Sequence, residues 1–330
     1  MSAAQYDVVG IGNAIVDVIA RADDGFLQGR KLAKGAMTLI DEAEADALYA
    51  AMGPGTESSG GSAANTMAGV ASLGGTGALF GKVRDDQLGK VFAHDIRAIG
   101  VSFESAPATA GPATARCLIL VTPDAQRTMN TYLGACVNLG PEDVDEAVVK
   151  RARVTYLEGY LWDPPRAKEA FLRAAKIAHG AGRKVSLSLS DAFCVGRYRT
   201  EFRDLVAGHV DILFANETEI MALYEVDSFD AALQEVRGKC EIACLTRSEK
   251  GSVIVAGEEV HVIDVDRVGA VVDTTGAGDL YAAGFLFGWT HGYGLARAGR
   301  TASLAAAEAI SHVGARPQTS LKALVKQKLG

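Results

Sequence analysis

Short apolar runs alternate with amphipathic stretches over most of the chain. Residues 6–11 are apolar, rich in β-branched side chains and followed by a glycine-containing turn, so they predict a strand. Runs of the same character recur at residues 154–157, 185–189, 212–214 and 242–246. Helical patterns separate these runs from Pro141 onward. This alternation predicts βαβ units and a mainly parallel sheet that is covered by helices.

Capping signals mark where several helices begin. Asp41 followed by Glu44 has the form of a capping box and predicts a helix start. Ser62 is expected to cap a second helix that runs to Leu73. Apolar positions at helical spacing over residues 88–99 predict a third helix with one buried face.

The pattern changes between residues 101 and 133. Two apolar runs flank the turn-like tetrapeptide Pro123-Asp124-Ala125-Gln126, as in a β-hairpin. We therefore expect a small β-rich lid beside an α/β core. The expected lid comprises residues 13–58 and 101–133, and the expected core comprises residues 1–12, 59–100 and 134–330.

Composition narrows the classes of partner. The chain has 330 residues, 48% of them hydrophobic, and a formal charge of −7, which opposes general binding to nucleic acid or to an anionic membrane. Its N-terminus lacks a basic n-region, and no apolar run reaches the ~18 residues that a membrane span needs. We expect a cytoplasmic protein with a small-molecule substrate, as a monomer or a homodimer. The 5 cysteines contain no C-x-x-C pair, and the 6 histidines show no metal-ligand spacing.

The most informative segment is residues 272–279, which is rich in small residues and precedes an apolar helix. Small residues let backbone N–H groups at a helix N-terminus approach an anion closely, and the helix dipole adds attraction. Asp279, in the first turn, is placed to accept a proton from a hydroxyl that attacks phosphorus. Taken alone, the segment also fits a glycine-rich turn in which Asp279 only caps the helix.

Residues 273–279, D-T-T-G-A-G-D, match the D-T-x-G-A-G-D signature of the ribokinase-like (phosphofructokinase-B) carbohydrate kinases. The chain resembles this family along nearly its whole length. The resemblance implies a ribokinase-like three-layer α/β core with a mainly parallel sheet and a small β-rich lid. It also implies ATP and Mg²⁺ as cofactors, an anion hole formed by Gly276, Ala277 and Gly278, and Asp279 as the catalytic base.

Two further segments resemble the substrate-binding parts of the family. Residues 60–65 are similar to its G-G-x-x-x-N pattern, although alone they also fit a simple helix start. Residues 12–17 are similar to the G-N-x-x-x-D segment of adenosine kinases. The resemblance implies that substrate hydroxyls are bound by Asn13, Asp17, Gly60, Gly61 and Asn65.

The resemblance also assigns nucleotide and metal positions. Residues 216–219 match the N-x-x-E motif, which implies that Asn216 and Glu219 organise Mg²⁺ and phosphate, Glu219 through water. Alone, this motif also fits an Asn N-cap. Residues 246–251 resemble the nucleotide-binding T-x-G-x-x-G strand end through Thr246 and Gly251, with Ser248 in place of the first glycine.

Three more residues take roles from the same family. Arg127, in the expected lid hairpin, matches an arginine that reaches the phosphates when the lid closes. Asp273 and the carbonyl group of Thr275 are implied to help hold a monovalent cation such as K⁺.

Within the family the chain is most similar to adenosine kinases. The expected reaction is therefore transfer of the γ-phosphoryl group of MgATP to the 5′-hydroxyl of adenosine or a related nucleoside. Tyr160, Trp162 and Phe193 are candidates for an apolar slot for the base, or simply for core positions. Two alternatives stay open: a kinase for another sugar, such as ribose or fructose, and a nucleoside- or sugar-binding regulator without turnover. A Walker-type ATPase is disfavoured because the chain has no G-x-x-x-x-G-K-[ST] motif.

Overall fold

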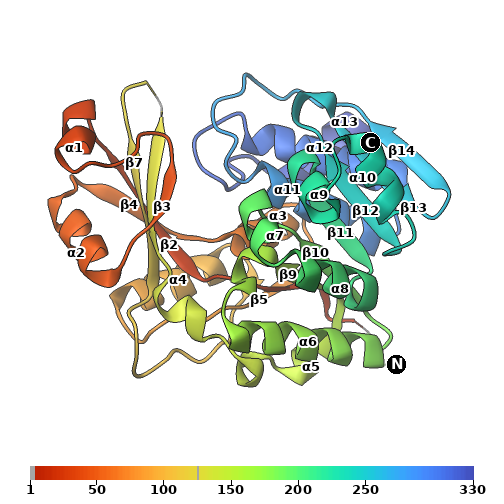
Figure 1. The fold of residues 1–330 in the computed structure, drawn as a ribbon, viewed down its shortest axis with the longest axis horizontal. Coiled ribbons are helices and arrows are strands. Elements are labelled where there is room, and N and C mark those ends of the chain that lie inside the picture. Colours follow the sequence, from red (N-terminus) through yellow and green to blue (C-terminus); the bar gives the residue numbers. More distant parts are fainter. Residues whose placement is uncertain (1–3, 125) are drawn as a thin grey trace.

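The computed structural model describes residues 4–124 and 126–330, which form two β-sheets of different size (Figure 1). The smaller sheet stands beside the larger, helix-covered one. Ala125, in the predicted hairpin turn, lies outside the described residues. No helix in the described part of the chain is both long enough and apolar enough to cross a membrane.

The larger sheet has nine strands. Its spatial order is β14 (Glu259–Ile263), β13 (Ser252–Ala256), β12 (Ile242–Thr246), β11 (Ile212–Asn216), β10 (Lys184–Ser188), β9 (Ala152–Glu158), β1 (Tyr6–Ile11), β5 (Gly77–Phe80) and β6 (Val101–Ser102). Neighbouring strands are parallel from β6 across to β12, and β13 and β14 are antiparallel additions. The predicted strands and their mainly parallel arrangement are confirmed.

Helices cover both faces of this sheet. One face carries α3 (Ser62–Ser72), α11 (Ala277–Thr290), α12 (Leu295–Ala309) and α13 (Leu321–Leu329). The other carries α5 (Glu146–Lys150), α6 (Pro165–Gly180), α7 (Ala192–Arg197), α8 (Arg199–His209), α9 (Glu217–Tyr224) and α10 (Phe229–Val236). Successive strand residues face opposite layers, so buried Val8 belongs to the first core and buried Val9 to the second. The predicted three-layer α/β class is confirmed.

The smaller sheet has five strands. Its order is β3 (Met37–Leu39), β8 (Arg127–Tyr132), β7 (Ala115–Val121), β2 (Ile15–Arg21) and β4 (Gly55–Gly60). Strands β7 and β8 form the predicted antiparallel hairpin. Helices α1 (Asp24–Gly29) and α2 (Glu42–Ala51) lie on the side away from the large sheet (Figure 1). Helix α4 (Gln87–Ala98) packs against β6 and against this smaller sheet.

Helix starts follow the capping signals with one exception. Asp41 and Glu44 form the predicted capping box of α2, each side chain accepting the backbone N–H of the other, at 2.8 and 3.0 Å. Helix α3 begins at Ser62, but its N-cap is Gly61, with a φ of 95°, and no side chain caps it. The prediction that Ser62 caps this helix is therefore wrong. Its hydroxyl instead donates to a carboxylate on α11.

Candidate active site

The start of α11 presents backbone amides without partners. Gly276 is the N-cap with a φ of 79°, and a Cβ there would lie 2.6 Å from the Cβ of Ala315, so only glycine fits. The amide of Ala277 donates to the carbonyl of Thr274 at 3.2 Å. Among the described residues, the amides of Gly278 and Asp279 have no acceptor, and a Cβ at Gly278 would meet open space. This helix end can therefore receive an anion.

The carboxylate of Asp279 is fixed by two side chains of α3. Its Oδ1 accepts the hydroxyl of Ser62 at 2.6 Å, and its Oδ2 accepts Nδ2 of Asn65 at 3.0 Å. Burial raises the pKa of Asp279, whereas these two hydrogen bonds and the charge of Arg316 lower it. A carboxylate with a raised pKa at a helix N-terminus is equipped to accept a proton.

Ser62 and Arg316 are site residues that the sequence analysis missed. Ser62 was interpreted only as a cap, although it lies inside the G-G-x-x-x-N segment. Arg316 lies between α12 and α13 and is separated from Asn65 by 251 positions. Its Nε donates to Oδ1 of Asn65 at 3.2 Å, and its Nη2 donates to Oγ of Ser59 at 2.9 Å. No local pattern marks this arginine, because only the fold brings its loop to α3.

Asp17, on β2, keeps its carboxylate unbonded. Among the described residues no side chain or amide donates a hydrogen bond to it. Burial raises its pKa to about 6; the charges of Arg316 and Arg127 lower it, and that of Asp279 raises it. These electrostatic influences indicate that Asp17 lies near Asp279 at the α11 helix start. Its two oxygens are free to accept substrate hydroxyls.

Gly60 and Gly61 make room for this arrangement. A Cβ at Gly60 would lie 2.4 Å from Oδ2 of Asp17, and one at Gly61 would lie 2.1 Å from the carbonyl oxygen of Asn13. Gly61 also has a φ of 95°, which side-chain-bearing residues rarely adopt. Both predicted glycines therefore shape the site through the space that they leave.

The side chain of Asn13 is held by a residue that the sequence analysis did not single out. Its Nδ2 donates to Oε1 of Glu158 at 2.7 Å, and Oε2 of Glu158 accepts the amides of Asn13 and Ala63 at 3.3 and 2.8 Å. Glu158, at the end of β9, is 1% exposed, and burial raises its pKa to about 7. This buried carboxylate ties the start of the predicted substrate segment 12–17 to the start of α3.

Arg127 crosses from β8 to the segment before α11. It forms an ion pair with Oδ2 of Asp273, and both side chains are 9% exposed. The same Oδ2 accepts the amide of Gly314 at 2.9 Å, and Oδ1 accepts the amide and hydroxyl of Thr275 at 3.0 and 2.7 Å. Both oxygens of Asp273 are thus occupied, so in this arrangement the carboxylate does not fit a monovalent cation. We derive no step through such an ion.

The predicted nucleotide residues lie at adjacent strand ends. Asn216, at the end of β11, pairs in register with Thr246 at the end of β12. Gly251 has a φ of 78°, and a Cβ there would lie 2.1 Å from the carbonyl oxygen of Ile263. Ser248, which replaces the family glycine, adopts a φ of 50°. The backbone therefore keeps a glycine-like conformation at this position.

Asn216 and Glu219 form a capping box at the start of α9. Oδ1 of Asn216 accepts the backbone amide of Glu219 at 2.9 Å. The Glu219 carboxylate in turn accepts the backbone amide of Asn216 at 2.9 Å and its side-chain Nδ2 at 2.6 Å. Glu219 is 5% exposed; burial raises its pKa to about 7, and the nearby charge of Asp191 also raises it. Across residues 4–124 and 126–330, no three acidic, His or Cys side chains gather as direct metal ligands. The carboxylates of Glu219 and Asp191 interact electrostatically, and oxygen ligands of this kind fit a hydrated Mg²⁺.

Tyr160 connects the two ends of the site. Burial raises its pKa, and the charges of Asp191, Asp279 and Glu219 raise it further. Tyr160 therefore lies within electrostatic range of the starts of both α9 and α11. Tyr160 and Phe193 are 41% and 74% exposed, whereas Trp162 is buried between Phe171 and Phe202 and belongs to the core.

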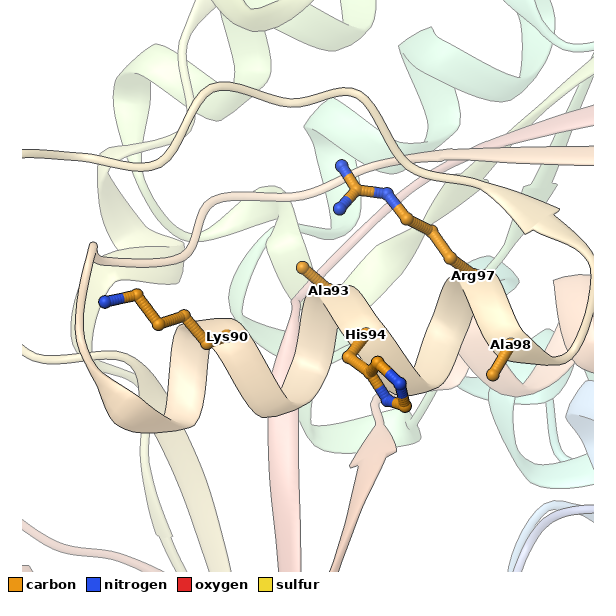
Figure 2. A pocket seen from close by; sticks show the side chains of 5 residues that line it. All are labelled: Lys90, Ala93, His94, Arg97 and Ala98. Carbon is orange, nitrogen blue, oxygen red and sulfur yellow. The ribbon is translucent and has the colours of Figure 1, made fainter.

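A separate surface hollow of about 490 Å³ lies on α4 and contains none of the predicted site residues (Figure 2). All of its lining side chains come from that one helix: Lys90, Ala93, His94, Arg97 and Ala98. It lacks the carboxylates and free amides that the α11 site combines.

Comparisons with known proteins identify the family of the chain. The pfkB family carbohydrate kinase pattern matches residues 36–322. A structure of adenosine kinase from Sinorhizobium meliloti is 57% identical with a TM-score of 0.91, covering 98% of this chain and 99% of that one. A structure of a probable sugar kinase from Rhizobium etli CFN 42 is 55% identical with a TM-score of 0.91, covering 98% of both. An ATP-dependent ribose-1-phosphate kinase from Halopiger xanaduensis is 32% identical over 265 residues, 79% of this chain and 83% of that protein. The chain therefore belongs to the pfkB family of carbohydrate kinases.

Proposed function

We propose that this kinase transfers the γ-phosphoryl group of ATP to the 5′-hydroxyl of adenosine or a related nucleoside, with Asp279 as the general base. One observation carries the proposal. The Asp279 carboxylate, held by Ser62 and Asn65, lies in the first turn of a helix whose amides at Gly278 and Asp279 have no partner in the described chain. A proton acceptor and a site for developing negative charge thus occupy the same place.

In the proposed reaction Asp279 takes the proton of the attacking hydroxyl as its oxygen bonds to the γ-phosphorus. The bond from that phosphorus to the bridging oxygen breaks, and ADP leaves. The amides of Gly276, Ala277 and Gly278 stabilise the charge on the transferring group, with that of Ala277 shared with Thr274. Burial raises the pKa of Asp279, which strengthens it as a base.

Asp17 is proposed as the main residue that recognises the acceptor substrate. Its carboxylate has no hydrogen-bond partner in the described chain and can accept both hydroxyls of a ribose diol. Asn13 and Asn65 match the substrate-binding pattern, but their amides hold Glu158 and Asp279. We assign them to shaping the site around the ribose. Similarity over 98% of the chain to an adenosine kinase favours a nucleoside acceptor.

We propose that the nucleotide lies beside Thr246 and Gly251, next to the α9 start. Mg²⁺ supplies charge neutralisation to the phosphates when it is bound with the nucleotide. Glu219 and Asp191 would hold it through water. We further propose that residues 13–58 and 101–133 act as a lid, with Arg127 presented from it to the phosphoryl-transfer region.

A kinase of another sugar is the second candidate. The charges of Arg316 and Arg127 both act on Asp17, the residue proposed to bind the acceptor. This pair of arginines suits an acceptor that already carries an anionic group. A relative with 32% identity is a ribose-1-phosphate kinase.

A coupled ADP-release assay over several acceptors separates these candidates. We expect the highest kcat/KM with adenosine and a strong loss with 2′-deoxyadenosine, because a buried carboxylate left without its hydroxyl partner is costly. Asp17→Ala should weaken adenosine far more than ATP and remove most of that discrimination. A higher kcat/KM for ribose, fructose or ribose 1-phosphate would replace the nucleoside with that sugar. No turnover with any acceptor would favour a binding regulator.

A further inference from the structure

The loop between α12 and α13 is held near its end and near its middle. Near its end, Oε1 of buried Glu308 accepts the amides of Gln318 and Thr319 at 3.0 and 2.8 Å, and the Thr319 hydroxyl at 3.0 Å. Near its middle, the amide of Gly314 donates to Asp273 at 2.9 Å. The loop is therefore held against the segment that leads into α11. Its position fixes where the side chain of Arg316 begins.

The guanidinium group of Arg316 reaches α3 and β4 rather than solvent. Its Nε donates to Oδ1 of Asn65 and its Nη2 donates to Oγ of Ser59, while Nη1 lies 3.9 Å from Asp95 on α4. Oδ2 of Asp95 in turn accepts the amide of Ser59 at 2.7 Å. The arginine is thus held between α3, which carries Asn65, and β4, which carries Ser59.

This contact decides which way the Asn65 amide faces. A guanidinium group can only donate hydrogen bonds, and an ionised carboxylate can only accept them. With Oδ1 of Asn65 bound to Arg316, Nδ2 must point to Asp279, where it donates at 3.0 Å. The reversed amide would set N–H against N–H and oxygen against oxygen. The three side chains therefore form a chain of hydrogen bonds with one direction, and that direction fixes Oδ2 of Asp279 as an acceptor that carries no proton.

The charges around Asp279 make a compensating cation necessary. Four groups interact electrostatically with Asp279. They are the carboxylates of Asp17 on β2 and Glu158 on β9, and the phenols of Tyr156 on β9 and of Tyr160. Its direct partners on α3, Ser62 and Asn65, are neutral.

Arg316 is the cation that acts on Asp279 itself, and Arg127 acts on neighbouring Asp17. Without Arg316, ionisation of Asp279 would be less favourable, because the neighbouring negative charges would act on it without this compensating cation.

We infer that Arg316 is a positioning residue for phosphoryl transfer, orienting Asn65 toward Asp279 and keeping that carboxylate free of its proton. The inference rests on the proposed role of Asp279 as the base. It assigns a function to a loop residue that no motif of the chain marks, and it makes the α12–α13 loop part of the catalytic apparatus.

The test is the dependence of kcat on pH for the wild type, Arg316→Gln and Arg316→Lys. Removing a nearby positive charge raises the pKa of a carboxylate, so on acidification turnover should begin to fall at a higher pH. We expect the acidic limb of Arg316→Gln to move up by about one pH unit or more. Arg316→Lys keeps the charge and should keep the limb near its wild-type position, with a lower plateau. An exposed arginine on α6 provides the control: Arg173→Gln also removes one charge and should leave the profile unchanged.

An unmoved acidic limb in a folded Arg316→Gln enzyme would overturn the inference. If Arg316→Gln fails to fold, Arg316→Lys provides the test. An acidic limb of Arg316→Lys that moves by about one pH unit, although the positive charge is retained, would also overturn the inference. Asp279→Asn separates this outcome from failure of the proposed function. Near-native turnover by Asp279→Asn removes the base itself, whereas an inactive Asp279→Asn with an unmoved Arg316→Gln limb removes only the role of Arg316.

A double-mutant cycle tests the route through Asn65. If Arg316 acts by orienting Asn65, then Arg316→Gln and Asn65→Ala should lower the plateau kcat by less together than the product of their separate factors. Independent, fully multiplicative losses would contradict the positioning role.

Discussion

Glu158 offers a test of the buried electrostatics that does not depend on activity. Its carboxylate is 1% exposed and accepts three hydrogen bonds, from the amides of Asn13 and Ala63 and from Nδ2 of Asn13. Glu158→Gln preserves the shape and can keep the oxygen that receives the two backbone amides. It removes the charge, so the variant isolates the cost of ionising this group inside the protein.

The magnitude follows from the pKa. Burial raises the pKa of Glu158 from 4.5 to about 7, so between these pH values the folded protein binds more protons than the unfolded chain. The free energy of unfolding must then fall as the pH rises. Integrating this linkage from pH 5 to pH 8 gives a loss of about 2 to 3 kcal/mol from Glu158 alone. Glutamine does not titrate and escapes this loss.

The assay is urea unfolding of the wild type and Glu158→Gln at pH 5 and pH 8. Relative to the wild type, the variant should gain about 2 to 3 kcal/mol on going from pH 5 to pH 8. Glu169→Gln, at an exposed position on α6, should show no such gain. An equal stability difference between variant and wild type at both pH values would refute the reasoning. It would mean that Glu158 ionises as readily in the folded protein as in the unfolded chain.

Three further substitutions probe the rest of the site. Gly60→Ala should raise KM for the acceptor and leave KM for ATP unchanged, because the added methyl group displaces Asp17. In the control Gly53→Ala the methyl group meets nothing within 4 Å, so neither KM should change. Equal acceptor KM values in both variants would count against the role of Asp17. Glu219→Gln retains a residue suited to the capping box but loses the charge, so activity should require more Mg²⁺, and an unchanged Mg²⁺ titration would exclude Glu219. Ser248→Gly should raise the free energy of unfolding, measured in urea, by about 0.5 kcal/mol, because glycine adopts the left-handed φ of 50° without the strain of a side chain. A loss of stability would show that the serine conformation is not strained.

The sequence predicted the parts of the molecule that depend on local pattern. Strand runs such as residues 212–214 and the capping box at Asp41 can be read from periodicity and spacing alone. The same holds for the helix that begins at Ala277, because a run of small residues before an apolar stretch marks its start. These features need no knowledge of distant segments.

The residues that the sequence analysis missed all act across long separations. Ser62 has the side chain of a good cap, but Asp279, 217 positions away, takes its hydroxyl. Glu158 and Arg316 lie in no recognisable motif and gain their roles only when β9 and the α12–α13 loop meet α3. Local propensity cannot rank a hydrogen bond to a distant carboxylate above a cap, because both use the same hydroxyl.

The kinetics of Asp279→Asn test the central proposal most directly. The substitution keeps the size of the side chain and its place at the α11 start but removes the proton acceptor. We expect kcat with adenosine and ATP to fall about 100-fold or more, with little change in either KM, because the loss lies in the transition state. Near-native turnover by the folded variant would contradict the assignment of Asp279 as the base.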